Sequence, residues 1–147
     1  MKTRVSEVLR QKGRDVLTTA PATTVFECIA TMVKHNVGSI VVTEDDAVKG
    51  IFTERDYLRR IVLRGRTSKT TRVEEVMTPD VITVTPDETV ETCLSVMTAN
   101  KCRHLPVVAE GKLAGIVSIG DCVKQISREA QAQVDDLQAY VTGKYPA

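Results

Sequence analysis

The chain of 147 residues contains an internal repeat. Shifted by 65 positions, the segment from Asp15 to Arg59 aligns with itself without a gap and gives 12 identities over 45 positions. The identities include Pro21 with Pro86, Cys28 with Cys93 and Asp56 with Asp121. A unit of ~60 residues is too small to bury a good hydrophobic core alone. The repeat therefore predicts two similar units that pack against each other, sheet to sheet.

Each copy predicts the same order of elements, β-α-β-β-α. A short extended segment (16–18, and 81–83 in the second copy) leads into a helix with apolar residues at helical spacing. A β-branched run, a polar turn and a second apolar run then predict a hairpin over 39–53 and over 105–118. A closing helix follows each hairpin and ends near Gly65 in the first copy.

Capping patterns predict where the first helix of each copy begins. In the second copy, Thr85-Pro86-Asp87-Glu88 is a capping box with Pro at the first helical position. We therefore expect that helix to open there. In the first copy, Thr24 and Glu27 stand three residues apart, which leaves the start less closely defined.

Two segments lie outside the repeat. One holds six basic residues and no acidic one, against a net charge of +1 for the chain: Arg59, Arg60, Arg64, Arg66, Lys69 and Arg72. This segment either reaches a phosphate tail or is a solvated connection whose cations complement the preceding helix end. The other, from Val123 to Val141, has apolar residues at helical spacing. It predicts an amphipathic helix that packs on the body or on a second subunit.

Composition excludes several functional classes. Hydrophobic residues make up 42% and charged residues 27%, as in globular proteins, and no apolar run approaches the ~20 residues of a membrane span. The N-terminus lacks the apolar stretch of a secretory signal. Aromatic residues make up 3%, without Trp, which counts against stacking on nucleic acid. We expect a cytoplasmic protein that binds neither membrane nor nucleic acid.

The four cysteines, Cys28, Cys93, Cys102 and Cys122, show no CxxC and no zinc-ligand spacing with His35 or His104. Each stands among apolar neighbours, where Cys usually behaves as a small buried hydrophobe. Reduced core thiols are expected, with no metal site.

The motif Gly-Ile-x-[Thr/Ser]-x-x-Asp occurs in both copies, over 50–56 and 115–121. It stands where a strand passes into a helix, so free backbone N–H groups face whatever binds there. The hydroxyl of Thr53 or Ser118 can donate to a phosphate oxygen. The carboxylate of Asp56 or Asp121 can accept from two ribose hydroxyls. Alternatively, each pair only caps its helix.

A second candidate is the segment Lys101-Cys102-Arg103-His104-Leu105, which precedes a strand and brings three basic side chains together. Arg is suited to bidentate phosphate contact. A solvated turn explains the same residues equally well.

Together these residues resemble a tandem pair of cystathionine-β-synthase (CBS) domains, the Bateman module. The similarity runs from Val5 to Gln125. Its hallmarks are both Gly-Ile-x-[Thr/Ser]-x-x-Asp elements, the segment from Arg103 to Val108, and two lead-ins that begin at Val5 and Val73. The resemblance implies two CBS domains, over 5–66 and 67–126, related by a pseudo-two-fold axis and followed by a C-terminal helix and tail over 127–147.

The resemblance also implies a function. CBS pairs are regulatory modules that bind AMP, ADP, ATP, NAD(H) or S-adenosylmethionine in the clefts between their sheets, and they form homodimers. No catalytic cofactor is expected. Asp56 and Asp121 would hold ribose, and Thr53, Ser118, Arg103 and His104 would meet phosphate. The other expected nucleotide-binding residues would frame adenine or flank these positions: Thr18, Ala20, Gly38, Ser39, Ile40, Arg55, Thr83, Lys101, Leu105 and Gly120.

The two expected sites differ. The first copy has Gly38-Ser39-Ile40 where the second has Arg103-His104-Leu105, so it lacks a phosphate partner. Arg55 stands where the second copy has Gly120. Each cleft is therefore expected to prefer a different ligand, or one is empty.

Three functions compete. The leading one is a non-enzymatic adenylate sensor that signals by a conformational change. The second is a protein-contact regulator of a redox enzyme or transporter, since plant relatives in the family are associated with thioredoxin regulation. A small enzyme is the weakest of the three, because Ser118, Asp121 and His104 have no nucleophile elbow or P-loop beside them.

Overall fold

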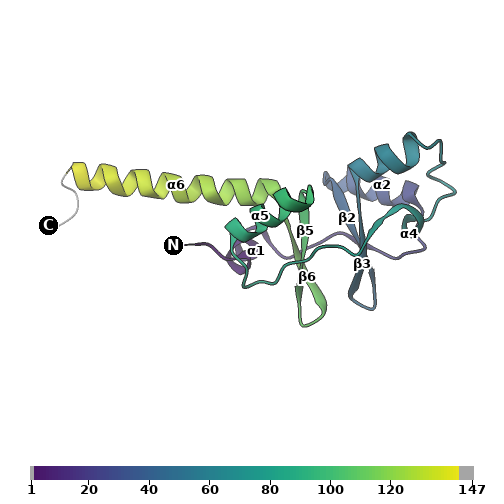
Figure 1. Ribbon diagram of the computed structural model, residues 1–147, viewed down its shortest axis with the longest axis horizontal. Helices are drawn as coiled ribbons and strands as arrows, with labels where there is room; N and C mark the ends of the chain where they lie inside the picture. Colours follow the sequence, from purple (N-terminus) through teal and green to yellow (C-terminus); the bar gives the residue numbers. More distant parts are fainter. Residues whose placement is uncertain (1, 143–147) are drawn as a thin grey trace.

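The computed structural model describes residues 2–142, which form two similar units side by side and one long projecting helix (Figure 1). The first unit contains the elements β1 Thr18–Thr19, α2 Val25–His35, β2 Ser39–Glu44, β3 Ala47–Thr53, α3 Glu54–Asp56 and the π-helix η1 Tyr57–Val62. The second contains α5 Val90–Asn100, β5 His104–Ala109, β6 Lys112–Ser118 and α6 Ile119–Val141. Two short helices and a strand complete the chain: α1 Val5–Lys12, α4 Val73–Val76 and β4 Thr78–Pro79. The mixed α/β architecture expected from the repeat is confirmed.

The two hairpins repeat each other in detail. β2 and β3 pair antiparallel with a register shift after Val42, and β5 and β6 pair with the same shift after Val107. The first sheet has the order β1-β2-β3-β4, with β1 parallel to β2. In the second unit a single parallel bridge, Val84 to Val107, takes the place of β1. The β-bulge therefore lies at equivalent positions of the two copies, 65 residues apart.

The lead-in helices cross between the units. The backbone N–H of Val5 donates to the Glu88 carbonyl at 2.8 Å, and that of Val73 donates to the Thr23 carbonyl at 2.7 Å. Consequently α1, at the start of the chain, packs on the second unit, and α4 packs on the first. This exchange fixes the two units relative to each other.

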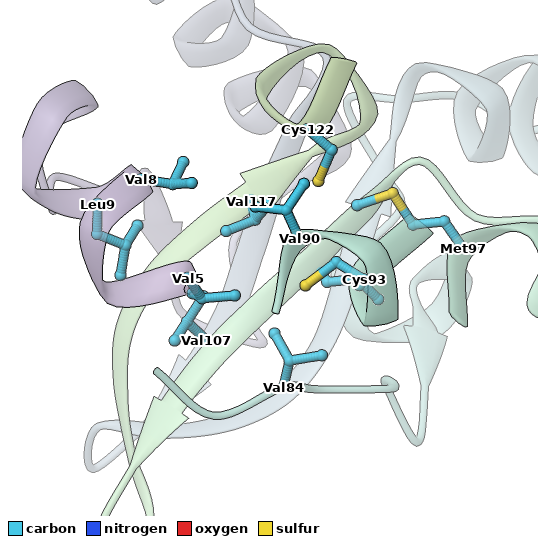
Figure 2. Packing of buried hydrophobic residues seen from close by; sticks show 11 residues of the cluster. Val5, Val8, Leu9, Val84, Val90, Cys93, Met97, Val107, Val117 and Cys122 are labelled. Atoms are coloured by element: carbon cyan, nitrogen blue, oxygen red, sulfur yellow. The ribbon is translucent and has the colours of Figure 1, made fainter. Parts of the chain in front are cut away.

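Each unit has its own hydrophobic core. The core of the second joins residues of α1 to those of α5, the hairpin and the first turn of α6 (Figure 2): Val5, Val8, Leu9, Val84, Val90, Cys93, Met97, Leu105, Val107, Val117 and Cys122. The first core is built in the same way around Phe52, with Val73 and Val76 supplied by α4. Cys28, Cys93 and Cys122 are buried and reduced, and Cys102 is half-buried.

The prediction that the helix of the second unit opens at Thr85 is wrong. The structure places its start at Val90, and the Thr89 hydroxyl accepts from the Thr92 N–H at 3.1 Å. The segment before it forms a turn instead, because the carbonyls of Pro86 and Glu88 accept hydrogen bonds from the first residues of α1. In the first unit, Thr24 is the N-cap of α2 and accepts from the Glu27 N–H.

Residues 119–141 form one uninterrupted helix, and the last part of the expected tail, 143–147, lies outside the described residues. The predicted amphipathic segment is confirmed, but α6 already begins at Ile119 and runs without a break through the expected boundary at 126/127. Figure 1 shows its distal half extending away from the body. None of the helices in residues 2–142 is both long and apolar enough to cross a membrane.

Candidate functional site

A cleft of about 540 Å³ lies between the two units. The second hairpin and the end of α1, which packs on the second unit, provide one wall, and the first unit with the segment before β1 provides the other. Its lining residues are Lys12, Asp15, Val16, Leu17, His35, Val37, Gly38, Ser39, His104, Ile116 and Ser118. The volume falls within the range of small-molecule sites. Both units must be in place for this cleft to exist.

The N-terminus of α6 meets the cleft at Ser118. The Ser118 hydroxyl accepts from the Asp121 N–H at 3.1 Å, and Asp121 Oδ2 accepts from the Ser118 N–H at 2.8 Å, which makes a capping box. Lys12 Nζ donates to the same carboxylate oxygen at 2.6 Å and to the Ile116 carbonyl at 3.0 Å. A hydroxyl, a carboxylate and an ammonium group therefore gather at one point beside the positive end of a long helix.

Two titratable groups at this point are perturbed. Burial raises the pKa of Asp121, but hydrogen bonds from Lys12 and from the Ser118 backbone outweigh it, so the pKa lies below its usual value of 3.8. The pKa of His104 lies below 6.5, chiefly because burial disfavours its charged form. At neutral pH the cleft thus presents a carboxylate, an ammonium group and a neutral imidazole.

The corresponding residues of the first copy form a second capping box. Asp56 Oδ2 accepts from the Thr53 N–H at 3.0 Å and from the Thr53 hydroxyl at 3.1 Å. Its other oxygen faces the Thr78 hydroxyl at 3.4 Å and Arg60 Nε at 3.8 Å. The Arg60 guanidinium also donates to the Met77 carbonyl at 2.8 Å. Asp56 is therefore more enclosed by its own unit than Asp121 is.

The structure brings together part of the predicted site. Gly38, Ser39, His104 and Ser118 line the cleft, and Asp121 is hydrogen-bonded to two of its lining residues. Ile40 and Leu105 lie in the hydrophobic cores and are not on the cleft wall. The remaining predicted residues are also not among the lining residues of this cleft: Thr18, Ala20, Thr53, Arg55, Asp56, Thr83, Lys101, Arg103 and Gly120.

Sequence reasoning missed several lining residues. Lys12 belongs to a lead-in helix and reaches the cleft only because α1 packs on the second unit. Val16, Leu17 and Val37 supply apolar surface just before β1 and β2. The repeat itself could have indicated Ile116, which stands two residues before Ser118 in the Gly-Ile motif. For the others no local signal exists in the sequence.

Several cations of the basic segment have partners within the first unit and the linker. Arg66 pairs with Glu75 at 2.9 Å, Arg72 pairs with Glu74 at 3.1 Å, and Lys69 lies 5.0 Å from the ring centre of Phe26.

Among residues 2–142 no three His, Cys, Asp or Glu side chains gather closely enough to hold a metal ion.

Comparison with known proteins agrees with this architecture. The CBS domain family model matches residues 5–63 and 73–128. The CBS domain-containing protein CBSX3, mitochondrial, of Arabidopsis thaliana is 40% identical over 152 residues, which cover 97% of this chain and 74% of that protein. The solved structure of a protein with CBS domains from Burkholderia ambifaria MC40-6 has a TM-score of 0.82 and 42% identity, and covers 84% of this chain and 93% of its own.

A third relative was solved with a nucleotide. The CBS domain protein PAE2072 from Pyrobaculum aerophilum, complexed with AMP, has a TM-score of 0.73 and 27% identity, over 81% of this chain and 89% of its own. With two matched domains, crossed lead-in helices and paired capping boxes, the chain belongs to the CBS domain family as a tandem CBS pair.

Proposed function

We propose that this CBS pair is a non-enzymatic sensor that binds an adenosine nucleotide in the cleft between its units. The observation that carries the proposal is the meeting of Ser118, Asp121 and Lys12 at the N-terminus of α6, beside an apolar cleft floor. The AMP complex of a relative with the same fold supports AMP as the first ligand to test. ADP, ATP, NAD(H) and S-adenosylmethionine share the adenosine group and are the next ligands to test.

The chemistry of the cleft fits the parts of a nucleotide. Val16, Leu17, Val37 and Ile116 offer apolar surface for a base. The Asp121 carboxylate is an acceptor suited to ribose hydroxyls. For phosphate, the Ser118 hydroxyl, the helix N-terminus and the cation of Lys12 are the matching groups.

Signalling follows from the position of the cleft. Because one wall comes from each unit, a bound nucleotide would contact both and favour the arrangement in which they close on it. The shift in population between the two arrangements is limited by the difference in the nucleotide's affinity for them. A regulated enzyme or transporter would read this change, and the exposed apolar residues of the first unit offer it a surface: Phe26, Val33, Leu58, Val62 and Leu63. The same surface favours the second candidate, regulation by protein contact with the nucleotide secondary.

The proposal includes a difference between the two halves of the molecule. Arg60 and Thr78 already contact the Oδ1 oxygen of Asp56, whereas Lys12 and Ser118 both bind the Oδ2 oxygen of Asp121. We therefore assign the main nucleotide site to Asp121 and a weaker or different ligand to Asp56. Self-association through the family's usual dimer contacts and a cytoplasmic location are part of the same proposal.

The test uses isothermal titration of AMP into matched variants. Asp121→Asn keeps an oxygen that can accept from the Ser118 N–H but loses the charge and one ribose acceptor, so AMP affinity is expected to fall at least about tenfold. Asp56→Asn is the matched control in the other copy and is expected to leave the main affinity within about twofold. Equal losses in both variants, or none in Asp121→Asn, would contradict the assignment.

A further inference from the structure

Helix α6 carries an 11-residue repeat that the nucleotide site does not use. Its apolar residues are spaced by three, four and four positions and then repeat: Val123, Ile126, Ala130, Val134, Leu137 and Val141. Eleven residues in three turns give 3.67 residues per turn, close to the 3.6 of a straight α-helix. The stripe therefore stays on one side of the whole helix, which is the pattern of a helix that pairs with another helix.

The body is held by a different face of α6. Cys122 is buried in the core of the second unit, the hydroxyl of Thr3 donates to Glu129, and Arg128 donates to Gln11 at 2.6 Å. The apolar stripe remains open to solvent: Val123 is 56% exposed, Leu137 66% and Val141 82%. The distal half of the helix extends away from the body (Figure 1). A continuous apolar stripe of this length on a projecting helix marks an interaction surface.

We propose that α6 pairs antiparallel with α6 of a second copy of this chain, about a two-fold axis at Ala130. In that register each residue faces the one equally far beyond Ala130. Val123 meets the partner's Leu137, seven positions to either side, and Ile126 meets the partner's Val134, four positions to either side. Ala130 meets its own copy, and its small side chain permits close approach at the axis. A self-complementary stripe is what a two-fold interface requires.

The charge pattern favours this orientation over a parallel one. The first half of α6 carries two cations and two carboxylates, Lys124, Arg128, Asp121 and Glu129, whereas the second half carries only Asp135 and Asp136. Antiparallel pairing places the acidic half alongside the partner's neutral half, which contains the cations. Parallel pairing would place Asp135 and Asp136 beside their own copies, within the ~10 Å over which surface charges interact at ordinary salt. A second copy therefore fits both the apolar and the charged pattern of the helix.

The first test is the mass of the full-length protein by light scattering during gel filtration. Leu137→Glu places a charge in the stripe and is expected to weaken association at least tenfold. At micromolar concentration the measured mass should then be that of the next smaller assembly. Ala132→Glu adds the same charge on the opposite face and is expected to leave the mass unchanged. The same mass for wild type and both variants would overturn the proposal and leave the stripe for another protein.

The second test fixes the orientation by disulfide trapping with diamide. Ala130→Cys is expected to form a covalent dimer, because only the residue on the axis meets its own copy. Leu137→Cys alone is expected to stay monomeric on a non-reducing gel, and a mixture of Leu137→Cys with Val123→Cys is expected to cross-link. Wild type controls for the four native cysteines. Self-cross-linking of Leu137→Cys, or none of Ala130→Cys, would contradict the antiparallel register. Neither test uses nucleotide, so its failure is distinct from failure of the sensor proposal.

Discussion

Lys12 Nζ lies 2.6 Å from Asp121 Oδ2, so the last residue of α1 is tied to the first turn of α6. The same carboxylate closes the capping box with Ser118. This contact joins the start of the chain, the second unit and the cleft at one ion pair. The structure and acid response of the cleft should both depend on it.

Replacement of Lys12 by Met is expected to raise the pKa of Asp121 and to cost about 1 kcal/mol of stability at pH 7, since both groups keep some contact with solvent. A carboxyl whose folded pKa is lowered stabilises the protein above its unfolded pKa, and this contribution is lost as the pH falls through the folded pKa. In Lys12→Met the difference from wild type should therefore shrink as the pH falls below 3.8. Urea unfolding at pH 7 and pH 3 measures this, with exposed Lys49→Met as the control. An equal loss at both pH values would show that the pair does not set the pKa.

His104 predicts that ligand binding takes up a proton. Burial, together with the nearby cations of Lys12 and Arg103, keeps the pKa of His104 below 6.5. The carboxylates of Asp121 and Glu54 act in the other direction and raise this pKa, but by less. The apo protein should lose stability as the pH falls below 6.5, because the unfolded state takes up the proton first. A bound phosphate would favour the imidazolium, so nucleotide binding should take up a proton.

Titration calorimetry in two buffers of different ionisation enthalpy measures this proton uptake at pH 6.5. His104→Gln is expected to abolish it, which separates His104 from titration of the phosphate itself. Equal uptake in the variant would place the proton elsewhere.

Lys101 is strained by its backbone. It ends α5 in the left-handed region at φ 54° and ψ 40°, where its counterpart in the first copy, Asn36, ends α2 at φ 53° and ψ 49°. Asn tolerates this conformation and Lys does not. Lys101→Asn is expected to raise the free energy of unfolding by about 1 kcal/mol, and Asn36→Lys to lower it by a similar amount, as measured by denaturant titration. Stabilisation by neither change, or by both, would contradict this explanation.

The two Gly-Ile glycines predict unequal costs. An added Cβ at Gly50 would lie 2.9 Å from the backbone carbonyl oxygen of Thr78 and against the side chain of Met77, whereas the nearest atoms to one at Gly115 belong to the Leu9 side chain, at 2.8 Å. A side chain can move more easily than a backbone. Gly50→Ala should therefore cost about 3 kcal/mol and Gly115→Ala about 1 kcal/mol, by thermal or denaturant unfolding. A larger cost at Gly115 would be the contrary result.

Much of the fold could be predicted from the sequence because the same pattern of strands and helices occurs in both copies of the repeat. Patterns within each copy predict both hairpins and both motif-bearing helix starts, and the apolar spacing beyond the repeat predicts the amphipathic C-terminal helix. The start of α5 was not predicted correctly, since Thr85–Glu88 is a good capping box until its carbonyls are taken by α1. That competition involves residues 80 and 83 positions apart, and no local pattern reports it.

The site could be predicted only in part, for a related reason. Ser118 and Asp121 belong to a motif whose spacing carries its chemistry, but Lys12 and Val16 reach the cleft through the packing of one unit on the other. The resemblance places Ile40 and Leu105 around adenine, and the structure places their side chains in the hydrophobic cores, on strands that bury several consecutive residues.

The most direct measurement is thermal unfolding of the wild-type protein and Asp121→Asn with AMP, ADP, ATP, NAD, NADH and S-adenosylmethionine. A ligand at 100 times its dissociation constant adds about 2.7 kcal/mol, which raises the midpoint by several degrees. The account predicts such a rise for at least one adenosine ligand with wild type, and a much smaller rise with Asp121→Asn. No shift with any of the six ligands, or an undiminished shift in the variant, would contradict nucleotide binding at this cleft.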